Sequence, residues 1–276
     1  MANPVFNNSP IFSEKAAARA GQATPPVPTA GDLQAQYQAP SPSADELGRM
    51  TYEDTIVKTA VSFGVLIAGA VLGWVLGSFP IVTIGAALIG FVLALVNIFK
   101  KEPSPPLILA YAAFEGIFVG GISMLYSLLF SSAIVPMAVF GTLGVVGVTL
   151  ALFASGKVRA SKRATKIFLV LLVGYAAFSL VNFGLMIFGV TDSMFGLRDM
   201  QIDLGFISFP LGVPLGILVV LLAAYSLVLD FDGVQRGVQQ GAPRKYAWTA
   251  AFGIMVTVVW LYLEILRLLA IIMGRR

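Results

Sequence analysis

The sequence predicts an all-α integral membrane protein, a bundle of seven transmembrane helices that follows a disordered amino-terminal tail. Of its 276 residues, 58% are hydrophobic and only 12% are charged, and the mean hydropathy is +0.88. An ordinary soluble domain carries about 25% charge. The chain has too few polar groups to cover its apolar surface in water. Most of it must therefore be solvated by lipid.

The first fifty residues differ from the rest, because they hold seven of the fifteen prolines and are rich in Ala, Gln and Ser. Such a composition buries too little apolar area to offset the entropy of ordering. We expect a disordered cytoplasmic tail over residues 1–50 and a membrane domain over 51–276. No apolar core follows the first residue, so this tail is not expected to be a cleaved signal peptide.

Apolar runs separated by turn signals or charges follow the tail. Each run is near or above the ~20 residues that a helix needs to cross ~30 Å of hydrocarbon. In the sixth run, Pro210 and Pro214 are expected to bend or delay the helix. The seven runs cover residues 55–76, 81–99, 107–130, 133–153, 167–188, 206–229 and 247–273.

Basic residues in the loops predict the orientation. The loops after the second, fourth and sixth runs hold ten Lys and Arg residues, whereas the alternate loops hold only Arg198. We therefore expect a multi-pass protein of the plasma (inner) membrane with a cytoplasmic amino terminus. With seven spans the carboxyl terminus would be external, where the basic Arg275 and Arg276 are unusual. Six spans with a re-entrant last segment are therefore the alternative. The ten residues are Lys100, Lys101, Lys157, Arg159, Lys162, Arg163, Lys166, Arg236, Arg244 and Lys245.

Histidine and cysteine are absent, which excludes disulfides, the usual zinc and haem sites and imidazole catalysis. No H-E-x-x-H, G-x-S-x-G or phosphate-loop motif occurs, and the signatures of aspartyl intramembrane proteases are missing. We therefore expect no enzyme, no resident cofactor and no nucleic-acid partner. Proton or cation chemistry is left to carboxylates.

Acidic residues within the apolar runs are the candidate functional groups, because an ionisable side chain there costs roughly 2.5 to 3.5 kcal/mol. Glu115 lies deep in the third run, and Asp230 and Asp232 stand at the predicted cytoplasmic end of the sixth. Two interpretations of Glu115 stay open. It is either a buried partner of Arg267 or Lys58, or part of a permeation path.

Glu264, in the last run, also has two interpretations. It lies three residues before Arg267, on the same helical face, so the two side chains can form a local ion pair. Alternatively, Glu264 is a titratable group coupled to Asp230. Two neighbouring carboxyl groups in a low dielectric would share one proton and act as a pH sensor. Once deprotonated, Asp230 and Glu264 would offer calcium the hard oxygen ligands that it prefers.

Glycines recur at the spacing of close helix packing. Gly73 with Gly77, and Gly116 with Gly120, are small-xxx-small pairs. We expect them to let neighbouring helices approach each other, and not to form a site.

The carboxyl-terminal motifs resemble those of a known family. Leu227-Val-Leu-Asp-Phe-Asp-Gly-Val234, followed by Leu261-Tyr-Leu-Glu-Ile-Leu-Arg-Leu-Leu269, is similar to the end of the Bax inhibitor-1 family. These are seven-helix membrane proteins that include pH-sensitive calcium-leak channels. The Pro-rich tail and the Phe114-Glu115-Gly116 sequence look like a bacterial branch of the family.

The resemblance implies a pH-sensitive cation leak, with calcium as the permeant ion. It places the family's pair of facing acids on Asp230 and Glu264, and the basic latch of the sixth-helix acid near Lys100 or Lys101. The sequence departs from the family motif in having Glu264 in place of an aspartate and Leu266-Arg267 in place of an asparagine. The alternative function is a non-transporting regulator that binds a membrane protease or another membrane-protein partner.

Overall fold

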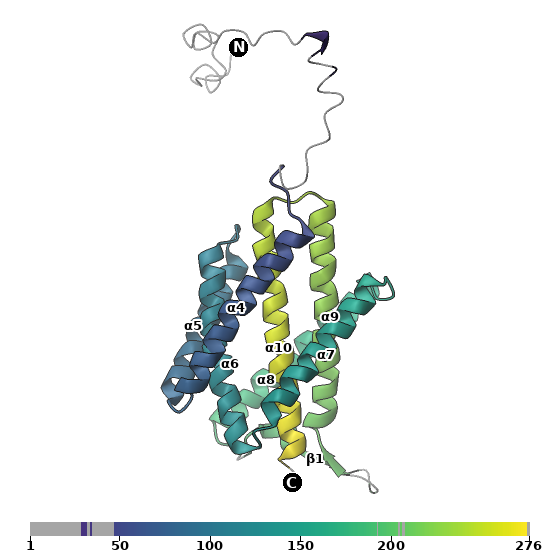
Figure 1. Ribbon diagram of the computed structural model, residues 1–276. Helices are drawn as coiled ribbons and strands as arrows, with labels where there is room; N and C mark the ends of the chain where they lie inside the picture. The colour runs from purple at the N-terminus through teal and green to yellow at the C-terminus, as the bar shows by residue number, and fades with distance from the viewer. Residues whose placement is uncertain are drawn as a thin grey trace, which may run out of the picture. The chain divides into compact units, whose positions relative to one another are not determined.

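The computed structural model describes residues 29–31, 34, 47–191, 193–203, 205 and 208–274. The expected tail therefore lies almost entirely outside the described residues. Among those residues, seven helices are long and apolar enough to cross a membrane, which confirms the predicted fold class (Figure 1). They are α4 (Tyr52–Leu76), α5 (Pro80–Phe99), α6 (Pro105–Leu129), α7 (Ile134–Ala154), α8 (Lys162–Ile187), α9 (Gly212–Gln239) and α10 (Ala247–Met273).

Local chemistry sets several helix starts. The Thr51 side chain accepts a hydrogen bond from the Asp54 amide at the start of α4, and Ser161 does the same for Ala164 in α8. Proline opens both α5 and α6, where its missing amide would have no helical partner. Helix α8 begins five residues before the predicted run, because Ser161 caps a charged first turn that hydropathy does not detect.

The sixth run differs most from its prediction. Helix α9 begins at Gly212, six residues later than predicted, and Pro214 fits within its first turn. Ahead of it, β1 (Gln201–Asp203) and β2 (Ser208–Pro210) form a two-stranded antiparallel sheet, and η1 (Gly196–Asp199) is a 3₁₀ turn. At its other end α9 continues ten residues past the predicted boundary. Asp230 and Asp232 therefore lie within the helix and not at its end.

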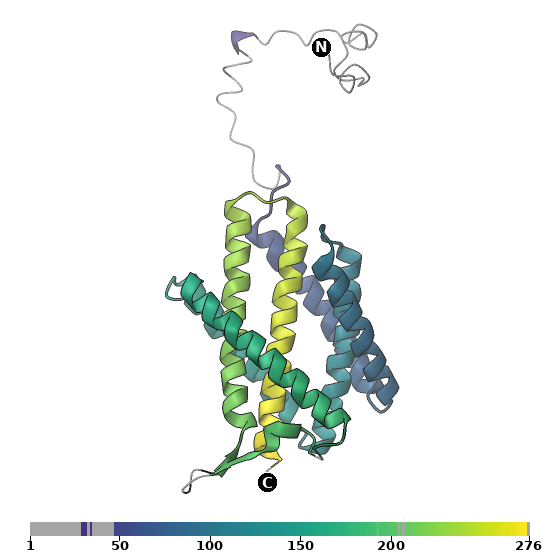
Figure 2. The same ribbon diagram turned by 180° about the vertical axis from the view of Figure 1, so that it is seen from behind.

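Helix α10 forms the centre of the bundle. It packs against α9, α4, α7 and α6, and α5 packs on α6. The helix is continuous from Ala247 to Met273 and is long and apolar enough to cross a membrane, without the break that a re-entrant segment would contain. Helix α8 is peripheral and crosses obliquely over α9 and α10, as the view from behind shows (Figure 2).

Helices α4 and α6 contact each other through glycines. A Cβ atom on Gly116 would overlap the Leu66 carbonyl oxygen, and one on Gly120 would overlap that of Ala70. The two backbones approach this closely only because the side chains are absent. The predicted packing role of this glycine pair is confirmed.

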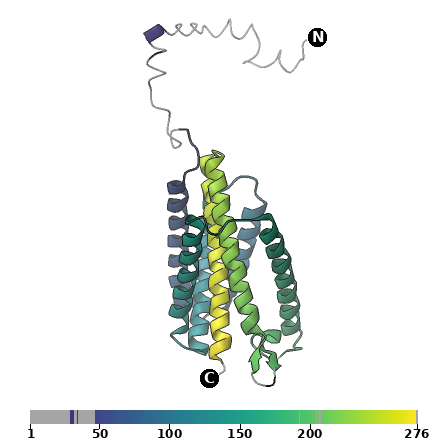
Figure 3. The same ribbon diagram turned by 90° about the vertical axis from the view of Figure 1, so that its right-hand side faces the viewer.

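The basic loops gather at one end of the bundle, which we call the basic end; it comprises residues 47–51, 99–105, 155–161 and 240–246. At this end the chain entering α4 is bonded to the α9–α10 loop: Met50 donates its amide to Ala242 (2.7 Å), and Arg244 donates to Gly48 (2.9 Å). Met50 is only 3% exposed. Figure 3 shows this segment beside the top of α9 and α10. The folded region thus begins before residue 51.

Candidate functional site

Glu264 lies in a cluster of polar side chains near the end of the bundle opposite the basic end. Its carboxylate accepts a hydrogen bond from the Tyr175 hydroxyl of α8. It also pairs with Arg267 at 2.7 Å, three residues along α10. The Glu264 side chain is 5% exposed. The local ion pair that the sequence allowed is therefore formed, and it is buried.

Arg198 joins this cluster from the loop before β1. Its guanidinium donates to the hydroxyl of Tyr175 (2.9 Å) and to that of Ser179 (3.0 Å). Burial, and next the nearby Arg267, lower the pKa of Arg198 below its ordinary value. Tyr175 also accepts from Arg267 at 3.1 Å. One carboxylate thus sits among a tyrosine and two guanidinium groups.

Asn182 fixes the loop that carries Arg198. Its amide oxygen accepts from the Leu197 backbone at 2.6 Å, and its amide nitrogen donates to the Phe195 carbonyl at 3.2 Å. Asn182 is 3% exposed. Asn182 therefore ties α8 to the loop through its hydrogen bonds.

Asp230 has different surroundings. The hydroxyl of Thr257, on α10, donates to its carboxylate at 2.7 Å. Ser226, one turn earlier on α9, lies 3.5 Å from the same hydroxyl. Within the part of the chain that the structure describes, Asp230 makes no ion pair. Its described hydrogen-bond partner is one neutral hydroxyl, that of Thr257.

Asp230 and Glu264 do not face each other. Asp230 lies level with Thr257, and Glu264 is seven residues farther along α10, about two turns or ~10 Å. Calcium requires ligand oxygens at 2.3–2.6 Å, so the two carboxyl groups cannot hold one ion or share one proton in this structure. The expected pairing at one depth, with its tentative calcium site, is not formed in this conformation. The antiparallel packing of α9 and α10 sets their register. In this register Asp230 lies opposite Thr257, whereas Glu264 contacts Tyr175 and Arg267.

Glu115 lies on α6 beside α5, where a Cβ on Gly90 would be 3.1 Å from its carboxylate. Lys58 instead bonds Asp54 at 2.9 Å, and Arg267 bonds Glu264. The interpretation of Glu115 as their partner is therefore wrong. Among the described residues no hydrogen bond or ion pair to its carboxyl group occurs, so a place in a permeation path stays a prediction.

The remaining candidates lie at or near the basic end. Lys100 and Lys101 are exposed beyond the end of α5, and the described partner of Asp230 is Thr257, not either lysine. The predicted latch is not formed in this conformation. Asp232 pairs with Arg236 one turn along α9, at 2.9 Å.

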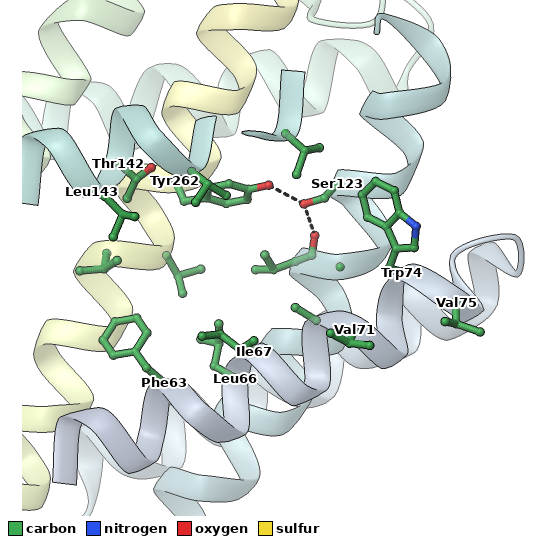
Figure 4. A pocket seen from close by; sticks show the side chains of 17 residues that line it. Phe63, Leu66, Ile67, Val71, Trp74, Val75, Ser123, Thr142, Leu143 and Tyr262 are labelled. Carbon is green, nitrogen blue, oxygen red and sulfur yellow. Dashed lines mark hydrogen bonds between the residues drawn. The ribbon is translucent and has the colours of Figure 1, made fainter. Parts of the chain in front are cut away.

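A separate apolar groove of ≈ 580 Å³ lies between α4, α6, α7 and α10 (Figure 4). Its few polar groups are satisfied: Ser123 lies 2.7 Å from the Tyr262 hydroxyl and donates to the Val119 carbonyl at 2.6 Å. Its 17 lining residues include no acid. The groove suits hydrocarbon and offers a cation no charged ligand.

The family model described as Bax inhibitor 1 like matches residues 3–274. The chain belongs to the Bax inhibitor-1-like family. No curated protein matches it. Membership confirms the resemblance seen in the last two helices of the sequence and extends it over nearly the whole chain.

The sequence did not single out three polar residues that contact Glu264, Asp230 or their partners. Tyr175 lies in an apolar run without a local signal, and Thr257 resembles any small residue of a membrane helix. Arg198 stands among three aspartates in a loop, a composition typical of a solvated segment. Its burial depends on the fold of η1 and β1, which the sequence pattern did not reveal.

Proposed function

We propose that this Bax inhibitor-1-like protein is a pH-sensitive cation leak of the plasma membrane, with calcium as the permeant ion and Asp230 as the controlling group. The observation that carries the proposal is the surroundings of Asp230: a carboxyl group within a membrane helix, bonded to a hydroxyl, without a cationic partner among the described residues. Intramembrane acids of this kind mark ion and proton pathways. Family membership supports the same function.

The two acids then have different roles. Glu264 pairs directly with Arg267, and Arg198 donates to the hydroxyl of Tyr175, which in turn donates to Glu264. Ionised Asp230 still needs a cation, which either a permeant ion or a lysine of the basic end would supply. Asp230 lies nine residues before the end of α9, ~13 Å from it. A latch through Lys100 or Lys101 therefore requires the helix ends to move.

The orientation follows from the positions of the basic loops. Since Lys and Arg residues accumulate on the cytoplasmic side, we place the basic end and the amino terminus in the cytoplasm. Asp230 then lies in the cytoplasmic half of the membrane, within reach of cytoplasmic protons. Labelling of single introduced cysteines at positions 101 and 200 with an impermeant reagent tests this placement, since only the second should react from outside.

Calcium flux into vesicles tests the function. The full chain is reconstituted with a calcium indicator, and the rate is measured between pH 5 and 8. Asp230→Asn should abolish the pH dependence, whereas Asp232→Asn, a matched change two residues away, should preserve it. An Asp230→Asn profile that matches the unmodified protein would refute the role of Asp230. Flux no greater than in protein-free vesicles at every pH would refute the leak itself.

The regulator alternative has its own outcome. A deletion of residues 2–43 removes most of the tail and leaves Gly48 and Met50 in place on the α9–α10 loop. If a cellular phenotype disappears with this deletion while calcium flux is unchanged, a partner bound by the tail explains the phenotype better than the leak does.

A further inference from the structure

A second groove lies between α8 and α9 near the basic end. It has a volume of about 550 Å³, a size typical of small-molecule sites. Lys162 and Lys166 form one wall and Arg236 belongs to the other. Asp232 also lines it and already pairs with Arg236. The groove therefore has an excess of positive charge.

The two lysines of this groove lack acidic partners. They lie one turn apart on one face of α8, and both are exposed. In the described parts of the chain neither forms an ion pair. Nearby, the hydroxyls of Thr165 and Tyr225 lie 3.0 Å apart and can donate to an anion.

The start of α8 adds a second electrostatic argument. Three cations, Lys162, Arg163 and Lys166, occupy its first five residues, and its first turn holds no acid. The amino-terminal end of a helix favours negative charge and disfavours cations. An anion bound between the lysines would compensate both their charges and the helix dipole.

Apolar side chains continue the groove away from the charges. Leu169 and Val170 of α8 line it together with Leu229 of α9. Leu169 lies seven residues beyond Lys162, ~10 Å along the helix axis. The site thus changes from cationic to apolar over the distance that separates a phospholipid phosphate from its acyl chains. A free inorganic anion would use only the first part.

We propose that the groove between α8 and α9 binds an anionic phospholipid, with its phosphate between Lys162 and Lys166 and an acyl chain along Leu169 and Leu229. Basic pockets between transmembrane helices bind such headgroups, and the cytoplasmic leaflet supplies anionic lipid. Helix α8 is peripheral and contacts Glu264 of α10 through Tyr175. A lipid in this groove would fix the angle between α8 and α9.

Native mass spectrometry of the full, delipidated protein tests the proposal, with dioleoyl phosphatidylglycerol and dioleoyl phosphatidylcholine as probes. Phosphatidylglycerol should bind at least tenfold more tightly. The double variant Lys162→Gln, Lys166→Gln should bind phosphatidylglycerol about 10- to 30-fold more weakly, because each lysine contributes roughly one charge contact with the headgroup. The double variant Lys162→Arg, Lys166→Arg keeps both positive charges and should still bind phosphatidylglycerol. Retained binding would show that the loss in the glutamine variant comes from the missing charges.

Matched controls separate this site from general surface attraction. Lys100→Gln with Lys101→Gln removes the same charge at the same end but outside the groove, and it should change the affinity by less than about twofold. An equal loss in that variant would overturn the proposal, as would equal binding of phosphatidylcholine. Displacement of the lipid by millimolar inorganic phosphate would show a small-anion site and would overturn the assignment to lipid.

Discussion

Replacement of Glu264 by Gln should destabilise the bundle strongly, although the two side chains have nearly the same shape. The Glu264 side chain is 5% exposed and that of Arg267 is 28% exposed. Glu264→Gln leaves two guanidinium groups around one tyrosine without a carboxylate. Loss of one partner from a buried ion pair costs about 3–5 kcal/mol. Tyr175→Phe, which removes only hydrogen bonds, should cost about 0.6–1.7 kcal/mol.

A double-mutant cycle distinguishes compensation of charge from loss of contacts. Replacement of Glu264 by Gln and Arg267 by Met together removes both charges, and buried ion pairs replaced as a unit are often nearly neutral. We expect the double variant to lie within about 2 kcal/mol of the unmodified protein, with a coupling energy of at least ~2 kcal/mol. Asp230→Asn, whose partner is a neutral hydroxyl, should cost about 1 kcal/mol or less.

The assay is equilibrium unfolding in mixed micelles of a mild detergent and dodecyl sulfate, followed by circular dichroism. Each variant is compared at the same protein and lipid concentration, since bound lipid shifts stability. A cost below ~1 kcal/mol for Glu264→Gln, or a double variant as unstable as the sum of the single ones, would refute the argument that Glu264 compensates buried positive charge.

Three further predictions concern packing and the basic end. Gly120→Val should destabilise α4–α6 packing by about 1–3 kcal/mol or more, and Gly174→Val, whose Cβ would meet open space, should not; unfolding measurements compare them. Met50→Ala should cost about 2–5 kcal/mol and expose the adjacent backbone to hydrogen exchange. Lys245 lowers the pKa of Glu102 by a hydrogen bond, so the contribution of Glu102 should be present at pH 7 and disappear as pH falls through that lowered pKa. Melting temperatures of Glu102→Gln and the unmodified protein should therefore converge at acid pH.

Hydropathy predicted the membrane helices well because membrane thickness sets their length. The run predicted at 247–273 coincides with α10, and that at 55–76 misses only the capped first turn of α4. The Gly116 and Gly120 spacing likewise predicted a contact, since small residues at this interval have few other roles in a membrane helix. These features depend on local sequence alone.

Register between helices was the part that could not be predicted. The charges at Asp230 and Asp232 suggested the end of a helix, yet backbone hydrogen bonding continues α9 to Gln239. The family motif places acids on two neighbouring helices, but motif similarity transfers residue types and not their relative depth. Arg267 lies three residues from Glu264 on the same helix, so helix geometry alone brings the two side chains together. In the structure Glu264 pairs with this arginine and not with Asp230.

Direct pairing of Asp230 with Glu264 in another conformation would require a large rearrangement. Helix α9 would have to slide about two turns along α10, ~10 Å. That motion would separate Gly216 of α9 from Leu268 of α10. The two residues are packed so closely that a Cβ atom added to Gly216 would lie 2.9 Å from the Leu268 side chain. In the present structure Glu264 pairs with Arg267 and links α8 to α10 through Tyr175, whereas the described partner of Asp230 is the neutral Thr257 hydroxyl. The proposed pH sensitivity therefore depends on Asp230 alone and needs no contact between the two acids.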